Sequence, residues 1–358
     1  MILVPGDSSA MPRLPIVDLD HVLQWTLPCW DRLRGARLFI TGGTGFFGSW
    51  LLESLAWVAD RQKIPIEAVV LTRSPAAFAL RKPHLAEHRV IRLHSGDIRN
   101  FTFPDGRFTH VIHGAFPSGS PHSSVSEISS LMLSGTERTL EFCREADVGS
   151  YLFISSGAVY GRQPDHLAEI PETYCATLES AHSRSAYGEA KYLAELTCCH
   201  RAGQTGLAVK IARCFAFVGP GLPLDAHFAI GNFLRDALHD GPIAVNGDGT
   251  AVRSYLYAAD LAVWLWALLV RGESGRAYNV GSPHALSLAE LADLIVREIA
   301  PDASVQIRQR LDPTKPVERY VPHVGRAAVE MQLIPRIPLA EALRRTAEWA
   351  RRLPLTSA

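Results

Sequence analysis

Three side chains in the middle of the sequence have the types and spacing needed for proton transfer beside an alcohol carbon. Tyr187 and Lys191 stand four residues apart in a predicted helix, so both side chains lie on one helical face. A lysine ammonium near a phenol favours the phenolate and lowers a pKa that is ordinarily about 10. Ser156 follows the apolar segment Ser150–Ile154, a predicted strand, and its hydroxyl can orient a substrate oxygen. The three residues predict proton transfer at a carbon that exchanges hydride with a nicotinamide.

Tyrosine and lysine at this spacing are common on solvated helix faces, so the pair needs support from a cofactor site. Arg37–Thr41 is a short apolar run with a β-branched centre, typical of a buried parallel strand, and a predicted helix begins at Ser49. Between them, Gly42 permits a tight turn, Gly45 lets backbone N–H groups approach a pyrophosphate, and Gly48 allows close helix packing. The diphosphate would lie at the positive end of the helix dipole. A glycine-rich turn without a ligand is the alternative. The predicted cofactor contacts in this loop are Gly42, Gly45, Phe46, Phe47 and Gly48.

Strands and helices alternate along the chain, which predicts an α/β fold of Rossmann type with a doubly wound parallel sheet. Further strands are expected at Glu67–Thr72, Arg89–Leu93, Thr109–His113 and Ser150–Ile154. We expect an N-terminal extension over residues 1–34, with an extra helix on the surface of the domain or against a partner subunit. An NAD(P)-binding domain is expected over 35–215, with 251–281 returning to it. A smaller C-terminal substrate lobe would comprise 216–250 and 282–358, with the active site between the lobes.

The residues after the second strand bear on the choice of cofactor. An NAD-preferring domain usually places an acidic residue there for the ribose 2′-hydroxyl, whereas this chain has Thr72 and Arg73. A guanidinium suits a 2′-phosphate, so Arg73 favours NADP over NAD, unless it is an ordinary surface arginine. Asp97 either accepts a hydrogen bond from the adenine amine or caps a turn. Further predicted cofactor contacts are Ile98, His113 and Ala115, together with Tyr187 and Lys191. We expect His113 to be a structural neighbour of the cofactor rather than an acid or base.

Composition excludes several other classes of function. The 358 residues carry 36 basic and 36 acidic side chains, so the net charge gives no steering toward nucleic acid or an anionic membrane. The longest apolar run, residues 261–270, is too short to span a bilayer and predicts a core helix. We see no signal-peptide pattern, and the six cysteines show no metal-binding CxxC pair. The expectation is a cytoplasmic protein without a metal.

The ordered set of motifs resembles the extended short-chain dehydrogenase/reductase family, and within it the nucleotide-sugar epimerases and dehydratases. The motifs are TGxxGxxG at Thr41–Gly48, Gly96–Asp97, Ser156, and Tyr187 with Lys191, and the resemblance covers residues 36 to 300. It implies that Ser156, Tyr187 and Lys191 form a catalytic trio acting on a nucleoside-diphosphate sugar. It also implies that Arg253 binds the substrate diphosphate, that Asn232 contacts the nucleotide, and that two chains pair as a homodimer through helices that include residues 126–146 and Tyr187.

Departures from the family pattern narrow the expected reaction. The 4,6-dehydratases of the family carry an Asp-Glu pair just after the strand-end Thr or Ser, where this chain has Gly157 and Ala158. Met132 and Ala216 stand where the family often has asparagines. Because glycine and alanine cannot transfer protons, we expect an epimerase that oxidises a sugar hydroxyl to a transient keto-sugar and re-reduces it on the other face. An NADPH-dependent keto-sugar reductase, a dehydratase using other acid/base residues, a carbonyl reductase for non-sugar substrates and a non-catalytic NAD(P)-sensing module remain as alternatives.

Overall fold

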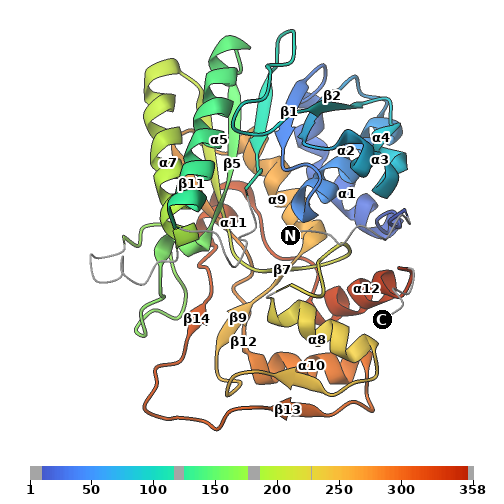
Figure 1. The fold of residues 1–358 in the computed structure, drawn as a ribbon, viewed down its shortest axis with the longest axis vertical. Coiled ribbons are helices and arrows are strands. Elements are labelled where there is room, and N and C mark those ends of the chain that lie inside the picture. Colours follow the sequence, from blue (N-terminus) through green and yellow to red (C-terminus); the bar gives the residue numbers. More distant parts are fainter. Residues whose placement is uncertain (1–9, 117–124, 176–185, 227, 354–358) are drawn as a thin grey trace.

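A central parallel sheet organises the chain. The computed structural model describes residues 10–116, 125–175, 186–226 and 228–353. Seven parallel strands lie in the order β11-β6-β5-β4-β1-β2-β3 (Figure 1). Their bounds are β1 Arg37–Thr41, β2 Glu67–Thr72, β3 Ile91–Ser95, β4 His110–His113, β5 Ser150–Ser156, β6 Ala208–Cys214 and β11 Arg276–Val280. The order reverses beside β1, which confirms the predicted doubly wound α/β sheet.

The third strand lies two residues further along the chain than predicted. The Ile91 N–H donates to the carbonyl oxygen of His88 (2.9 Å), so the residues between them form a turn and pairing with β2 begins at Ile91. The apolar character of Val90 therefore reflects burial next to the strand and not membership of it.

Alternating side chains of β1 divide the core into two layers. Leu38 and Ile40 point into one hydrophobic cluster with α1, α2 and α9, whereas Phe39 points into the other with α5 and α7. Figure 1 shows α5 and α7 side by side on one face of the sheet and α1, α2 and α9 on the other. These helices are α1 Ile16–Arg32, α2 Phe46–Gln62, α5 Val125–Glu145, α7 Ala186–Thr205 and α9 Ala258–Arg271.

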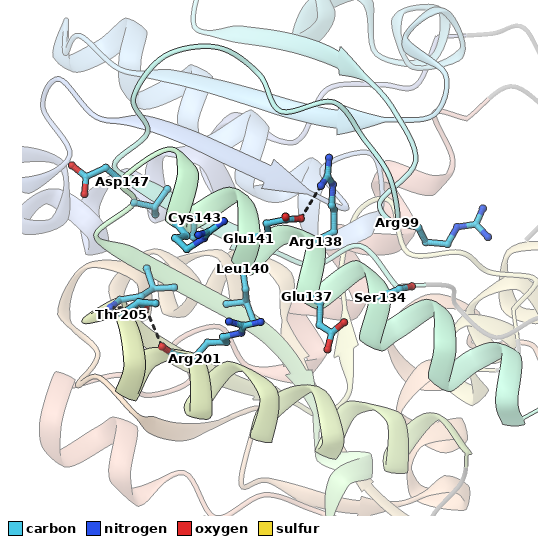
Figure 2. A pocket seen from close by; sticks show the side chains of 13 residues that line it. Arg99, Ser134, Glu137, Arg138, Leu140, Glu141, Cys143, Asp147, Arg201 and Thr205 are labelled. Atoms are coloured by element: carbon cyan, nitrogen blue, oxygen red, sulfur yellow. Dashed lines mark hydrogen bonds and ion pairs between the residues drawn. The ribbon is translucent and has the colours of Figure 1, made fainter.

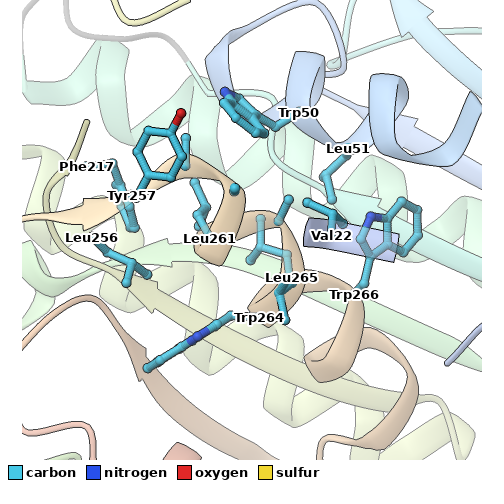
Figure 3. Packing of buried hydrophobic residues seen from close by; sticks show 14 of the residues in the cluster. Val22, Trp50, Leu51, Phe217, Leu256, Tyr257, Leu261, Trp264, Leu265 and Trp266 are labelled. Carbon is cyan, nitrogen blue, oxygen red and sulfur yellow. The ribbon is translucent and has the colours of Figure 1, made fainter. Parts of the chain in front are cut away.

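The apolar run predicted to form a core helix is α9, which is buried on nearly all sides. Figure 3 shows its tryptophans pointing in different directions, with Val22 of α1 and Trp50 of α2 packed around the same helix. The rings of Trp30 and Trp266 lie 4.9 Å apart, so the extra N-terminal helix α1 is part of the core and not a loose cover. In the residues that the structure describes, no helix has both the length and the apolar character needed to cross a membrane.

A buried carboxylate ties α1 to the C-terminal part of the chain. Asp18 is fully buried and accepts hydrogen bonds from the Tyr257 hydroxyl (2.6 Å) and from Arg345 of α12 (2.5 Å). Because each partner comes from a distant segment, this contact fixes α1 against both β10 (Leu256–Tyr257) and α12 (Leu339–Ala350).

Smaller sheets and helices form the rest of the molecule. A three-stranded sheet, β12-β9-β14, and two-stranded pairs β10-β7 and β13-β8 lie beyond the central sheet. The strand bounds are β7 Phe217–Val218, β8 Ile243–Val245, β9 Val252–Ser254, β10 Leu256–Tyr257, β12 Ala285–Ser287, β13 Val305–Ile307 and β14 Arg319–Tyr320. The helices are α3 Pro75–Arg81, α4 Pro83–Ala86, the 3-10 helix η1 Gly157–Tyr160, α8 Ala229–Leu238, α10 Leu288–Ile299, α11 Gly325–Met331 and α12 Leu339–Ala350.

Candidate active site

Ser156 and Tyr187 meet at the carboxyl end of β5. Ser156 is the last residue of the strand, and its Oγ accepts a hydrogen bond from the N–H of Ala158 in η1 (3.2 Å). Tyr187 lies in the first turn of α7, and its phenol is close enough to Ser156 for the serine hydroxyl to influence the pKa of the phenol. A Cβ at Gly188 would lie 2.4 Å from the Ala158 carbonyl oxygen, so glycine there lets α7 approach η1 closely. The structure thus brings together two of the three predicted catalytic residues.

Lys191 lies on the same helix one turn further on, but its ammonium group points elsewhere. Its Nζ donates to the carbonyl oxygen of Ile154 (2.6 Å) and lies 2.9 Å from the centre of the Phe116 ring. The distance from Nζ to the centre of the Tyr187 ring is 5.7 Å. Complete burial lowers the pKa of Lys191 well below its usual value, because the ammonium has lost its hydration.

This arrangement differs from the expectation that Lys191 lowers the pKa of Tyr187. Burial raises the pKa of the Tyr187 phenol above its ordinary value, and the nearby Ser156 hydroxyl partly opposes that shift. The lysine does not offset the burial because its Nζ is bonded to the Ile154 carbonyl. In the chain itself, Tyr187 is therefore a phenol at neutral pH, which can donate a proton.

The glycine loop has the shape of a diphosphate cradle. Gly42 has a φ of 75°, and a Cβ there would lie 2.4 Å from the Gly114 carbonyl oxygen. A Cβ at Gly48 would lie 2.3 Å from the Cα of Gly43, so α2 packs directly on the loop. At Gly45, the N-cap of the 17-residue helix α2, a Cβ would meet only the Gly42 carbonyl oxygen, at 3.5 Å. The loop is thus tightly packed at Gly42 and Gly48 but open at Gly45, next to the N-terminus of α2. This shape fits the diphosphate of a dinucleotide.

Thr41, which the sequence did not single out, joins the ends of β1 and β4. Its hydroxyl is hydrogen-bonded to His113 Nδ1 (2.7 Å) and accepts from the N–H groups of Gly114 (3.2 Å) and Ala115 (3.1 Å). Burial, with the charge of Lys191 second, lowers the pKa of His113 well below its usual value, so the ring stays neutral. The hydrogen bonds of Thr41 therefore hold the predicted contacts His113 and Ala115 in fixed positions beside the glycine loop.

The other predicted cofactor contacts lie along the same edge of the sheet. Asp97 forms an ion pair with Arg99 (2.7 Å) and accepts from the Arg99 N–H (3.0 Å), as expected of a residue that caps a turn. The side chain of Ile98 packs against Gly135 of α5. Arg73 is exposed, and its charge helps to lower the pKa of Asp97 after the larger effect of Arg99. A preference for NADP through Arg73 stays a prediction, which titration of both cofactors decides.

At the start of α2, Phe47 packs edge-on against Phe217 (5.0 Å), next to Phe46.

The two residues expected to bind substrate lie in different places. Arg253 on β9 forms an ion pair with Glu318 (2.9 Å) and donates to the Glu318 carbonyl oxygen (3.1 Å). It stands opposite Tyr320 in the pairing of β9 with β14, and the Tyr320 hydroxyl lies beside Gly157, where a Cβ would be 2.7 Å from it. Asn232 on α8 accepts from Arg235 (3.4 Å), and no hydrogen bond in the described ranges links it to Arg253 or Ser156. The strand pairing thus connects Arg253 to the end of β5 through Tyr320, but the substrate contacts of Arg253 and Asn232 both stay predictions.

Two further features of the site were missed in the sequence. The hydroxyl of Tyr320 lies beside Gly157, where a Cβ would be 2.7 Å from it, and nothing in the proline-containing segment before Tyr320 signals that contact. Behind the strand end, Glu195 accepts from the Ser155 hydroxyl (2.5 Å) and from Arg213 (2.7 Å). Glu195 stands four residues after Lys191, so helical spacing could have placed it near the same strand end.

Fold and site together define an enzyme with a dinucleotide cradle beside a serine–tyrosine pair. The model of the NAD dependent epimerase/dehydratase family matches residues 38–281. The chain belongs to this family and is therefore an NAD-dependent enzyme, as the motifs predicted.

Both sequence and structure comparisons agree with this membership. UDP-glucuronic acid decarboxylase 1 of Arabidopsis thaliana is 28% identical over 314 residues, which cover 86% of this chain and 68% of the relative. The enzyme of the same name from Xenopus tropicalis is 27% identical over 324 residues, with 88% and 72% covered. Among solved structures, dTDP-glucose 4,6-dehydratase of Streptomyces venezuelae with NAD bound has a TM-score of 0.72 at 26% identity, with 88% and 97% of the chains covered. UDP-glucose 4-epimerase of Thermotoga maritima has a TM-score of 0.74 at 20% identity, with 88% and 99% covered, and shares the fold.

Proposed function

We propose that the chain is an NAD(P)-dependent 4-epimerase of a nucleoside-diphosphate sugar. The observation that carries the proposal is the position of Tyr187 beside Ser156, at a strand end where Gly157 and Ala158 supply no further acid or base. One proton-transfer group suffices to oxidise and re-reduce a single carbon, whereas elimination of water needs a second.

The residues would divide the chemistry as follows. When bound in the Gly42–Gly48 cradle, the nicotinamide supplies a hydride acceptor and then a hydride donor. Ser156 holds the sugar oxygen, and Tyr187 takes its proton in the oxidation and gives it back in the reduction. The raised pKa of Tyr187 favours the proton-donating half of this cycle. Arg253 offers a guanidinium for the diphosphate, in competition with Glu318.

The relatives favour a second candidate reaction. The plant and frog relatives are named for decarboxylation of UDP-glucuronic acid. Oxidation of such a sugar at C4 places a ketone two carbons from the carboxylate carbon, and a β-keto acid loses carbon dioxide readily. A decarboxylase would therefore use the same first half-reaction on a different substrate.

A panel of nucleotide sugars separates these candidates. The purified chain is incubated with UDP-glucose, UDP-galactose, UDP-glucuronic acid and dTDP-glucose. C4 epimers formed without added cofactor support the proposal, and release of carbon dioxide from UDP-glucuronic acid supports the second candidate. Consumption of NADPH with a keto-sugar would indicate a reductase. Tight NAD(P) binding without any turnover would contradict all three.

Replacement of Tyr187 by phenylalanine tests the residue assigned to proton transfer. Tyr187→Phe removes only a hydroxyl, so we expect an unchanged melting temperature and cofactor affinity, with turnover lower by roughly 10² or more. Tyr174→Phe is the matched control, because Tyr174 packs in the neighbouring aromatic cluster with its ring 6.2 Å from that of Tyr160. A Tyr187→Phe enzyme with most of its activity would remove Tyr187 from the mechanism.

A further inference from the structure

We propose that Glu195 is a positioning residue of the active site, which together with Arg213 fixes helix α7 on the end of β5 and thereby sets the place of Tyr187. The inference deepens the proposed function and rests on it, because it concerns the residue assigned to proton transfer. Glu195 and Arg213 take no part in that chemistry, yet both are charged and little exposed, with side chains 4% and 13% exposed.

Three side chains of α7 form one stripe that faces the end of β5. Tyr187, Lys191 and Glu195 follow one another at intervals of four residues, so they lie on the same side of the helix. Lys191 donates to the carbonyl oxygen of Ile154 (2.6 Å). One turn further on, Glu195 accepts from the hydroxyl of Ser155 (2.5 Å). Two successive turns of α7 are thus bonded to two successive residues of β5.

The carboxylate of Glu195 also binds the neighbouring strand. Arg213 of β6 donates to both of its oxygens, with Nη2 2.7 Å from Oε2 and Nε 3.1 Å from Oε1. Because Arg213 and Ser155 are partners in the register of β6 with β5, Glu195 holds both strands at one level. The bidentate contact fixes the orientation of the carboxylate and the guanidinium as well as their separation.

Hydrogen bonds continue from Arg213 across the sheet. Its Nη1 donates to the hydroxyl of Tyr160 (2.9 Å), which donates to Oδ1 of Asn279 (2.8 Å). Asn279 is the partner of Arg213 in the register of β11 with β6. The side-chain amide of Asn279 donates to the carbonyl oxygens of Ile170 (2.8 Å) and His323 (3.0 Å). The ion pair is therefore itself held by polar groups from three strands and from the C-terminal segment.

This attachment determines where Tyr187 lies. Next to it, a Cβ at Gly188 would be 2.4 Å from the Ala158 carbonyl oxygen, so α7 has no room to move toward η1. A slip of the helix by one residue would move Tyr187 by about 1.5 Å along the axis, and a misplacement of this size can lower a rate by about 10². Because a buried ion pair adds little net stability compared with well-packed apolar residues, we expect its main effect in the geometry that it fixes.

Two double substitutions separate positioning from stability. Glu195→Met alone would leave the Arg213 guanidinium buried without its partner and lower the melting temperature. Glu195→Met with Arg213→Met, the double methionine variant, removes both charges and with them this penalty, but position 195 no longer accepts from the Ser155 hydroxyl. Glu195→Gln with Arg213→Met, the glutamine variant, also lacks both charges, whereas the glutamine oxygen still accepts from Ser155.

The position of residue 187 is measured through a 3-fluorotyrosine incorporated there, by ¹⁹F NMR of the full chain saturated with NAD. We expect the wild-type resonance in the glutamine variant and a shifted or broadened resonance in the double methionine variant. With UDP-glucose, kcat of the double methionine variant should be lower than that of the glutamine variant by about tenfold or more. KM and the affinity for NAD should differ by less than about twofold, because only the transition state needs the correct place of Tyr187.

Arg345→Met is the matched control, because it breaks a buried ion pair elsewhere in the fold, that with Asp18. It should lower the melting temperature and leave the ¹⁹F resonance unchanged. If the double methionine variant fails to fold, Ser155→Ala decides, because it removes only the hydroxyl that Glu195 holds. We expect a shifted resonance and a lower kcat there as well.

A wild-type ¹⁹F resonance in the double methionine variant or in Ser155→Ala would overturn the inference. Equal changes in the two double variants, or a changed resonance in Arg345→Met, would overturn it as well. Because the resonance is recorded without turnover, failure of every nucleotide sugar would refute the proposed function and leave this inference to be judged on the NMR result alone.

Discussion

Lys191 lies completely buried, with its Nζ bonded to the Ile154 carbonyl oxygen and close to the ring of Phe116. Burial lowers its pKa well below the usual value, so the unfolded chain binds this proton more readily than the folded chain. At pH values below the pKa that Lys191 has in the folded chain, the buried ammonium lowers the free energy of unfolding. This loss of stability disappears as the pH rises to the ordinary lysine pKa of about 10.5. The charge of Lys191 therefore lowers the stability of the fold at neutral pH.

Lys191→Met should increase the free energy of unfolding by about 1 kcal/mol at pH 7, because methionine fills a similar volume without a charge. The gain should shrink as the pH approaches 10.5, since the lysine is then neutral in both states. Urea unfolding at pH 7 and at higher pH measures the difference. Lys315→Met, at a side chain 75% exposed, is the control and should change little. A Lys191→Met protein that is less stable than the wild type at pH 7 would contradict this account.

The glycine loop is the element on which the cofactor site depends. Gly42→Ala adds a Cβ 2.4 Å from the Gly114 carbonyl oxygen at a positive φ, so we expect a loss of about 2 kcal/mol in stability and loss of NAD binding. Gly203→Ala near the end of α7 is the matched control, because a Cβ there meets no atom within 4 Å. It should stabilise the helix by about 0.5–1 kcal/mol. Calorimetry with NAD and thermal melting report both effects, and normal NAD affinity in Gly42→Ala would count against the cradle.

Local elements were predictable from the sequence because their signals are local. The strand Arg37–Thr41, its glycines and the pair Tyr187 and Lys191 all follow from spacing within one segment. Two features of the site did not follow. The direction of the Lys191 ammonium depends on the Ile154 carbonyl oxygen, and the approach of Tyr320 to Gly157 depends on packing between segments far apart in the chain. Gly157 was noted as an absent acid, but only packing shows what occupies the space beside it.

At the scale of the whole molecule, α5 and α7 present an outer face that remains a predicted homodimer interface. Leu193 and Leu196 on α7 are 44% and 50% exposed. A hollow of about 590 Å³ lies between the two helices. Figure 2 shows the side chains that line it, which include the charged residues Arg138, Glu141 and Arg201. Arg201 lies about 21 Å along the helix axis from Tyr187, so this hollow is separate from the active site.

We expect the wild type to sediment as a dimer at micromolar concentration and Leu196→Glu to sediment as a monomer, because a carboxylate in an apolar contact is poorly solvated. Val329→Glu on α11, at a side chain 85% exposed, should leave the dimer intact. A wild type that sediments as a monomer would show that this face is not an interface.

The proposed oxidation and re-reduction of one carbon is tested most directly with UDP-glucose that carries deuterium at C4. If the chain is a 4-epimerase, NMR should show UDP-galactose forming without added cofactor and with the deuterium retained at C4, because the hydride that leaves the carbon returns to it. UDP-galactose that has lost the deuterium to solvent would contradict the hydride mechanism. NAD-loaded protein that converts neither this sugar nor any other of the panel would contradict the proposed function itself.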